Sequence, residues 1–361
     1  MPNDRDLKIR LATIFWALGC YTRLEVKLAE YSPQRDMALE LTDLDVLGIR
    51  VSPELSFEHL VADCTSNRDV LKSPIQRVFW LRGVMDFFGA STGYLALNTA
   101  SGISENQRLV AHRLGVTILN TENLSHLEQR LAVADLAPLQ LTKQESWVYF
   151  ESNLQQLPKA LQPALSFRKH TYWLNPTYHN LHSVISLCGR HAKDIDERNR
   201  HHAALVLDLL SLFCLALLTM TSYVARTNPE DPEVELRSYF FGGYQEMRRR
   251  EAIIENVKKI VGEIPGQREL FADKIRLDPD YLRGLFEVAY RLLNRPEDAR
   301  HVPRYLEMVL FEKTLYKSEN AEGLKYLNER FSDVTKKLTR DIVKFFRDAT
   351  GLSEALFADL A

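Results

Sequence analysis

Short apolar segments alternate with helix-period segments over the first third of the chain. Leu7 to Leu18 has apolar residues at helical spacing before Gly19, and Thr22 to Leu28 alternates polar and apolar residues like a half-buried strand. The pattern then predicts strands over 41–51 and over 59–62, which runs on into 63–65, a helix over 73–88, a strand over 94–97, a helix over 105–114 and a strand over 116–119. This order, α-β-β-β-α-β-α-β, indicates a mixed sheet with covering helices.

Strand signals end near Ser125, and helical patterns separated by prolines and glycines fill the rest of the chain. The predicted helices cover 145–157, 180–189, 197–226, 232–262, 279–293, 296–316 and 321–350. Pro138 interrupts the pattern within 134–144. We therefore expect an α/β domain over residues 1–133 and an all-α helical domain over residues 145–361.

One predicted helix contains a segment long enough to cross a membrane. Ala203 to Ala225 is apolar and carries a single charge, that of Asp208. An acid inside a span is costly, the flanking anchors are weak and no second such segment exists. We therefore expect a core helix of the second domain and no membrane association. Asp208 should then reach a polar partner, a helix terminus or the surface.

Composition narrows the functional classes. The 361 residues are 45% hydrophobic with a net charge of −2, so no global basic field marks a nucleic-acid binder. Residues 1–125 carry 13 Lys and Arg against 15 Asp and Glu, which argues against strong DNA binding by that domain alone. The cysteines are too far apart to indicate a zinc site or a disulfide framework, and the charged N-terminus lacks a signal-peptide core. The expected location is the cytoplasm.

Acidic residues interrupt the apolar strands between 41 and 65. Asp43 and Asp45 are two positions apart and share a face of a strand, while Asp63 follows the next apolar run. Carboxylates about one strand spacing apart repel each other unless a divalent ion lies between them. The sequence therefore predicts that Asp45 and Asp63 lie on neighbouring strands and form a site for a hard cation.

At these residues the chain resembles the PD-(D/E)XK nuclease superfamily, which has the restriction-endonuclease-like fold. Asp45 stands at the position of the first acid, Asp63 at that of the second, and Thr65 at that of the lysine. The resemblance covers about the first third of the chain, and the predicted order of elements is that of the superfamily core. It implies that the two acids hold Mg²⁺ near the scissile phosphate while the lysine positions the nucleophile.

The missing lysine leaves two interpretations open. Lys72 is the nearest displaced candidate, and Gln76 lies on the helix beside the site, where some members carry Gln-xxx-Tyr with a tyrosine at the position of Trp80. Glu25 is either a further metal ligand or a solvated strand residue. Thr65 brings no positive charge, so the site is either degenerate and inactive or active with a displaced base.

Two other clusters carry candidate chemistry. His179 and His182 share a helix face and would suit a transition metal if a third ligand converged on them. Arg248–Arg250 and Lys258–Lys259 form a basic helix that could contact phosphates. Glutamates at salt-bridge spacing, Glu246, Glu251 and Glu255, accompany these arginines. We favour a solvated face for both clusters.

Three functions are consistent with these patterns. The leading hypothesis is a nucleic-acid-associated protein with a degenerate nuclease domain that acts as a DNA-binding or assembly subunit; the resemblance implies a context of bacterial restriction or anti-phage defence. The second is a Mg²⁺-dependent DNA endonuclease that uses Asp45, Asp63 and the displaced Lys72. The third is a protein-interaction scaffold in which both domains make contacts, with protein partners bound through the helical domain, and no nucleic acid binds.

Overall fold

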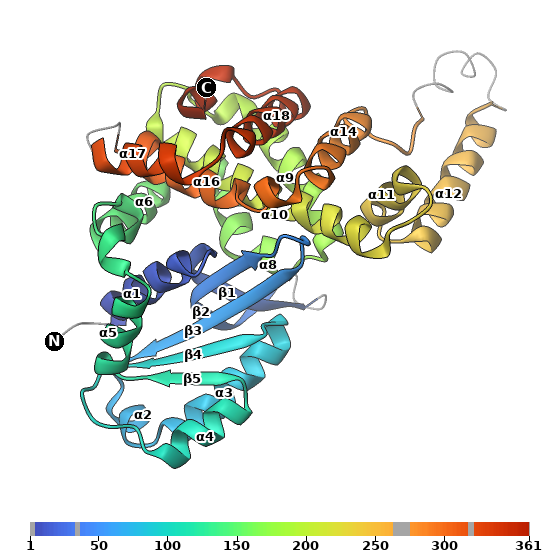
Figure 1. The fold of residues 1–361 in the computed structure, drawn as a ribbon. Coiled ribbons are helices and arrows are strands. Elements are labelled where there is room, and N and C mark those ends of the chain that lie inside the picture. The colour runs from blue at the N-terminus through green and yellow to red at the C-terminus, as the bar shows by residue number, and fades with distance from the viewer. Residues whose placement is uncertain (1–3, 33–36, 263–274, 317–320, 361) are drawn as a thin grey trace.

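The computed structural model describes residues 4–32, 37–262, 275–316 and 321–360. The N-terminal part is built around a five-stranded mixed sheet, and the rest of the chain is mostly helical (Figure 1). The predicted succession of an α/β part and a helical part is therefore confirmed. The division into two domains between residues 133 and 145 stays a prediction.

The strands lie in the sheet in the order in which they occur in the chain. β1 pairs antiparallel with β2 and β2 with β3, whereas β3 pairs parallel with β4 and β4 with β5. Parallel neighbours need a crossover, and α3 (Pro74–Phe88) and α4 (Glu105–Arg113) supply the two crossovers. The strands are β1 (Tyr21–Ser32), β2 (Met37–Val51), β3 (Phe57–Thr65), β4 (Thr92–Leu97) and β5 (Val116–Leu119).

Helices cover both faces of this sheet. The apolar side of α1 (Asp4–Ala17) packs on the first three strands, and α5 (Thr121–Arg130) joins the same buried cluster. The opposite face meets α3. Both contacts are close: a Cβ on Gly48 would lie 2.8 Å from the Phe15 ring, and one on Gly93 would lie 2.5 Å from Met85 Sδ. Glycine at these two positions therefore lets α1 and α3 approach the backbone of the sheet.

The helical part follows the predicted pattern with additional breaks. The segment 296–316, expected as one helix, is divided into α15, α16 and the π-helical η6 (Leu310–Leu315). The other elements are α2 (Arg68–Lys72), α6 (Gln144–Gln155), α7 (Gln162–Ser166), η4 (Phe167–Thr171), α8 (Tyr172–Leu174), α9 (Thr177–His191), α10 (Arg200–Thr227), α11 (Pro232–Phe240), α12 (Tyr244–Gly262), α14 (Leu282–Leu293), α15 (Pro296–Ala299), α16 (Val302–Val309), α17 (Ala321–Arg330) and α18 (Asp333–Thr350). Four short 3₁₀ segments precede or join these helices, η1 (Val133–Leu136), η2 (Gln140–Thr142), η3 (Lys159–Leu161) and η5 (Ala192–Asp194), and a fifth, η7 (Glu354–Leu360), follows α18.

The apolar helix α10 lies at the centre of the helical part, between α9, α14 and α16 (Figure 1). It is the one helix among the described residues whose length and hydropathy would allow it to cross a membrane, and 89% of its most apolar window is buried. Asp208, on this helix, is bonded to Arg23 and Arg168. The predictions of a core position for the helix and of a polar partner for its acid are both confirmed.

The helical part packs against β1, the edge strand nearest to it (Figure 1). η4, α8 and α16 contact this strand, and one apolar cluster runs from the sheet into the helices without a break. Polar bonds cross the same boundary: Thr22 donates to Glu307, and Arg304 donates to the carbonyl oxygen of Trp16. The sheet and the helices thus share one buried core.

Candidate functional site

The two acids of the predicted site lie on neighbouring antiparallel strands. The register pairs Val46 of β2 with Ala62 of β3, and one step further it sets Asp45 opposite Asp63. Hydrogen-bonded pairing ends at this point although both strands continue, so the strands separate beside the acids. Both side chains are buried, with 9% of Asp45 and 5% of Asp63 exposed. Asp43, two residues before Asp45, is exposed.

The Asp45 carboxylate lies in the gap between the strands. Its Oδ2 accepts the backbone N–H of Cys64 at 2.6 Å, and its Oδ1 lies 2.8 Å from Lys8 Nζ. Burial, with a smaller contribution from Asp63, raises the pKa of Asp45 against the opposing effects of Lys8 and Cys64. Burial alone would lower the pKa of Lys8, but its bonds to Asp45 and Glu25 raise it. The raised pKa of Lys8 keeps its ammonium group charged beside Asp45.

Lys8 comes from α1 and bridges two acids of the sheet. Besides Asp45 it contacts Glu25 Oε1 at 3.1 Å. Glu25 has the left-handed backbone conformation, φ 54°, within β1, and its side chain is 54% exposed. The alternative of Glu25 as a solvated strand residue matches this exposure. The side chain is nevertheless tied to the site through Lys8.

Asp63 has a cation of its own. Arg77, on α3, donates from Nε and Nη2 to the two carboxylate oxygens of Asp63, at 2.7 and 2.6 Å. Its guanidinium lies 3.6 Å from the centre of the Trp80 ring, three residues further along the helix. The hydrogen bonds to Asp63 raise the pKa of Arg77. A bidentate pair stacked on an aromatic ring is a rigid arrangement, and it fixes Asp63.

The residues predicted to take part in catalysis do not all reach the acids. Thr65 ends β3, and its Oγ1 accepts the backbone N–H of Asn67 at 3.1 Å, which shapes the turn into α2. Lys72 is the last residue of α2, and its side chain lies outside the described part of the structure. Gln76 is exposed on α3, one position before Arg77. The predicted roles of Lys72 and Gln76 stay predictions.

Lys8 and Arg77 are the residues of the site that sequence reasoning missed. Both are cations within amphipathic helices, in the segments LKIRL and QRVFW, where the helical pattern predicts solvent-exposed side chains. A signal was nevertheless present. Two acids predicted in a sheet interior require positive partners, and the flanking helices are the elements that can supply them. The pattern does not indicate which cation pairs with which acid.

A resident metal ion does not fit this donor set. Asp45 and Asp63 are already neutralised by Lys8 and Arg77, and a metal ion would have to displace both cations. Within the described ranges, no three His, Cys, Asp or Glu side chains come close enough together to hold a metal ion. Cys64 cannot add a thiolate readily, since burial and the two carboxylates raise its pKa well above the usual range.

The histidine pair and the basic helix predicted from the sequence make contacts within the chain. His182 Nδ1 lies 2.6 Å from the hydroxyl of Tyr281. Arg248 pairs with Glu251 at 3.1 Å, while Arg249 and Arg250 both pair with Glu246. The prediction of a salt-bridged, solvated basic helix is confirmed.

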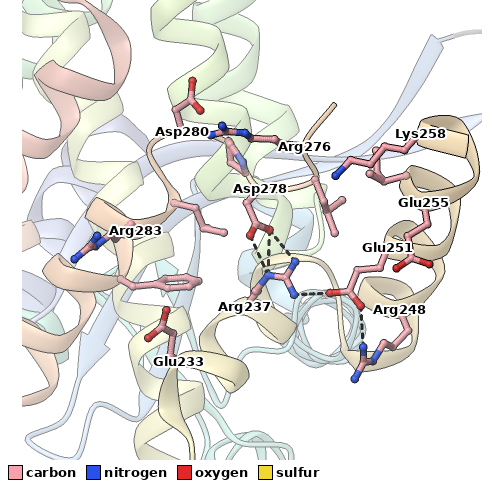
Figure 2. A pocket seen from close by; sticks show the side chains of 15 residues that line it. Glu233, Arg237, Arg248, Glu251, Glu255, Lys258, Arg276, Asp278, Asp280 and Arg283 are labelled. Atoms are coloured by element: carbon pink, nitrogen blue, oxygen red, sulfur yellow. Dashed lines mark hydrogen bonds and ion pairs between the residues drawn. The ribbon is translucent and has the colours of Figure 1, made fainter. Parts of the chain in front are cut away.

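A groove of about 740 Å³ lies between α12 and the segment 276–283 (Figure 2). Figure 2 shows Arg237 at its base, donating to Asp278 on one side and to Glu251 on the other. The described lining contains five basic and five acidic residues, so its charges balance. Such a groove offers no net attraction to a phosphate backbone.

Comparisons with known proteins do not identify the chain. No protein-family model, no curated protein and no solved structure matches it. The structure therefore defines the class of protein and no more. It is an α/β protein followed by a helical part, and it has two buried acids that are each paired with a cation of the same chain.

Replacing Arg77 by Met should lower the free energy of unfolding by about 1–2 kcal/mol, because buried Asp63 would lose its counterion. The matched control is Arg82→Met on the same helix, where Arg82 pairs with exposed Asp86, and there we expect a change below about 0.5 kcal/mol. Urea unfolding followed by circular dichroism measures both values. Equal losses in the two variants would contradict a stabilising role for the Asp63–Arg77 pair.

Proposed function

We propose that the chain is a nucleic-acid-associated protein whose restriction-endonuclease-like domain does not cut. It would act as a DNA-binding or assembly subunit. The observed elements through β5 follow the order implied by the resemblance to PD-(D/E)XK nucleases, apart from the short additional α2. The two acids at the matching positions lie on adjacent strands where pairing ends. These two observations support the fold assignment on which the proposal rests.

One observation supports the proposed lack of catalytic activity: each acid of the pair is bonded to a cation from a flanking helix. Lys8 forms an ion pair with Asp45, and Arg77 donates to both carboxylate oxygens of Asp63. In the nuclease family these oxygens are implied to hold Mg²⁺. The position of the lysine is taken by Thr65, whose hydroxyl accepts a bond within its own turn. Loss of one preorganised electrostatic donor costs on the order of 10²–10³ in rate.

A second candidate is an active Mg²⁺-dependent endonuclease. The observation that favours it is the position of Lys8, whose ammonium group lies 2.8 Å from Asp45. An ammonium group beside the first acid could serve as the displaced lysine, an alternative to Lys72. In that case Lys8 would have to release Asp45 before a metal ion could bind.

A cleavage assay distinguishes the two candidates. Wild type, Thr65→Lys, Lys8→Ala, Lys72→Ala and the exposed control Lys193→Ala are incubated with duplex and single-stranded DNA in Mg²⁺ or Mn²⁺. We expect no metal-dependent cleavage by wild type. A gain in Thr65→Lys would indicate that only the lysine is missing. Wild-type cleavage that disappears in Lys8→Ala or Lys72→Ala, but not in Lys193→Ala, would replace the proposal by the endonuclease.

DNA binding is tested separately, with the same wild-type preparation at several salt concentrations. Phosphate contacts release counterions, so binding should strengthen as salt is lowered. No binding to either form of DNA at low salt would overturn the nucleic-acid part of the proposal and favour the protein scaffold.

A further inference from the structure

A pocket of about 420 Å³ lies between the sheet and the helical part. Its sheet side is formed by the ends of β2 and β3 and by α3, and its helical side by residues 172–180, α10 and α11. The volume falls within the range typical of small-molecule sites. The acid pair at Asp45 and Asp63 does not line this pocket, so it is a separate feature of the molecule.

Aromatic rings line both the sheet side and the helical side of the pocket. His59 stands edge-on to the Phe88 ring at 5.6 Å, and Tyr223 lies 5.2 Å from Tyr239 on the helical side. The aromatic lining residues, from both parts of the chain, are Phe57, Phe88, Tyr172, Trp173, Tyr223 and Tyr239. Rings gathered on two sides of a cavity favour a planar, apolar ring system between them.

Hydrogen bonds within the chain hold these walls in place. The Tyr172 hydroxyl donates to the carbonyl oxygen of Leu212 at 2.9 Å, and Trp173 Nε1 donates to that of Arg168 at 2.9 Å. The Tyr239 hydroxyl donates to Thr177 Oγ1 at 2.9 Å. Three rings on the helical side of the pocket are therefore held in place before any ligand enters.

Arg226 and His59 are polar residues of the lining whose side chains are available to a ligand. Arg226 is exposed and is the only described lining residue with a permanent charge, and it makes no ion pair or hydrogen bond within the described chain. The imidazole of His59 contacts aromatic rings and has no hydrogen bond there either. Burial lowers the pKa of His59, so its ring is neutral and offers one donor and one acceptor.

We infer that this pocket binds a planar aromatic ring carrying one anionic group, with the ring between the aromatic walls and the anion at Arg226. His59 would hydrogen-bond the edge of the ring. Nucleoside monophosphates and aromatic carboxylates share this chemistry. The inference does not depend on the proposed nuclease-like function, because no residue of the acid pair takes part.

The test is ligand binding to the full chain, measured by saturation-transfer NMR and calorimetry. The probes are the four ribonucleoside monophosphates with their nucleosides, 4-hydroxybenzoate with phenol as its neutral counterpart, and inorganic phosphate. We expect one of the two anionic aromatic classes to bind more tightly than the corresponding neutral ring, and inorganic phosphate to bind weakly or not at all. The class that binds identifies the source of the ligand.

Two variants locate the ligand. Arg226→Gln should lower the affinity for the anionic probe about 5-fold and leave the affinity for the neutral nucleoside unchanged. Phe57→Leu should lower the affinity for both the anionic probe and the neutral nucleoside about 10-fold. The matched controls, Arg113→Gln and Phe79→Leu, change exposed residues outside the pocket and should have no effect. The inference is overturned if no aromatic probe binds, if phosphate alone binds as well as the nucleotides, or if Arg226→Gln and Phe57→Leu bind like wild type.

Discussion

Replacing Asp208 by Ala should lower the free energy of unfolding by about 3–5 kcal/mol, enough to leave much of the protein unfolded or insoluble. The reason is that the substitution leaves buried positive charges without their carboxylate partner. Asp208 is 2% exposed on the central helix α10, and its carboxylate bonds both Arg23 of β1 and Arg168 of η4. The substitution would deprive two buried guanidinium groups of this counterion at once.

The surrounding contacts decide how much of this loss can be recovered. Arg168 also pairs with Glu151 at 2.9 Å, and Glu151 pairs with Lys169 at 2.7 Å. Arg23 has no such second acid: it lies 2.5 Å from Asp208 Oδ1, and its Nε and Nη2 are buried without a partner among the described residues. Arg23 is therefore the group whose burial becomes most costly when Asp208 is removed.

Urea unfolding monitored by circular dichroism and by tryptophan fluorescence measures the loss. Asp208→Asn keeps a hydrogen-bond acceptor and should lose less than Asp208→Ala. The double variant Asp208→Leu with Arg23→Met removes both charges and should recover part of the stability. Glu246→Ala, which breaks salt bridges on the solvated face of α12, serves as the control and should change stability by less than about 1 kcal/mol. A loss below that value in Asp208→Ala would show that the cluster does not stabilise the fold.

The elements of the N-terminal part could be predicted because their signals are local. The alternation in Thr22–Leu28 and the helix stop at Gly89 each depend on a few neighbouring residues, and the structure has a strand and a helix end there. Helix α5 was missed, although Asn120 caps its first turn, because no long apolar stripe follows that cap. The long helix 296–316 was predicted without its break, although Pro303 in the first turn of α16 marks a helix start, and the π-helical η6 was missed because such segments are rare.

The partners within the sites could not be predicted in the same way. Lys8 and Asp45 are far apart in the sequence, and so are Arg23 and Asp208, so each pair exists only because the fold brings its members together. An isolated acid in an apolar run shows that a partner is needed, as it did for Asp208, but the sequence contains 46 Lys and Arg residues that could serve. The aromatic pocket is harder still to foresee, because its rings come from five separate elements.

Glu307 should make the fold less stable as the pH rises from about 4.5 to about 7. Its side chain is buried where α16 meets β1, and Oε1 accepts the Thr22 hydroxyl and the Thr22 backbone N–H, while Oε2 is buried without a described partner. Burial raises its pKa to about 7 against the opposing effects of Thr22, Arg304 and Arg23. The buried guanidinium of Arg304 is also unfavourable, since burial lowers its pKa to about 10.

The sign follows from proton linkage. A carboxyl whose pKa is higher in the folded than in the unfolded state binds its proton more tightly when folded. Its contribution to stability is therefore complete below the unfolded pKa and is lost as the pH rises through the folded value of about 7. A shift of this size corresponds to about 3 kcal/mol. Glu307→Gln removes the titration and should be more stable than wild type by about 3 kcal/mol at pH 8, because the variant does not bear the cost of ionising a buried carboxyl.

The measurement is the difference in the free energy of unfolding between Glu307→Gln and wild type from pH 4.5 to pH 8. A difference is needed because burial lowers the pKa of His301 to about 4, which makes stability rise with pH over part of the same range in both proteins. The difference should be near zero at pH 4.5, grow between pH 5 and 7 and level off above that. Glu322→Gln, at an exposed position on α17, should give a flat difference throughout. A Glu307→Gln curve that is flat, or that falls with pH, would mean that the Glu307 carboxylate is stabilised in its charged form by Arg304 and Thr22.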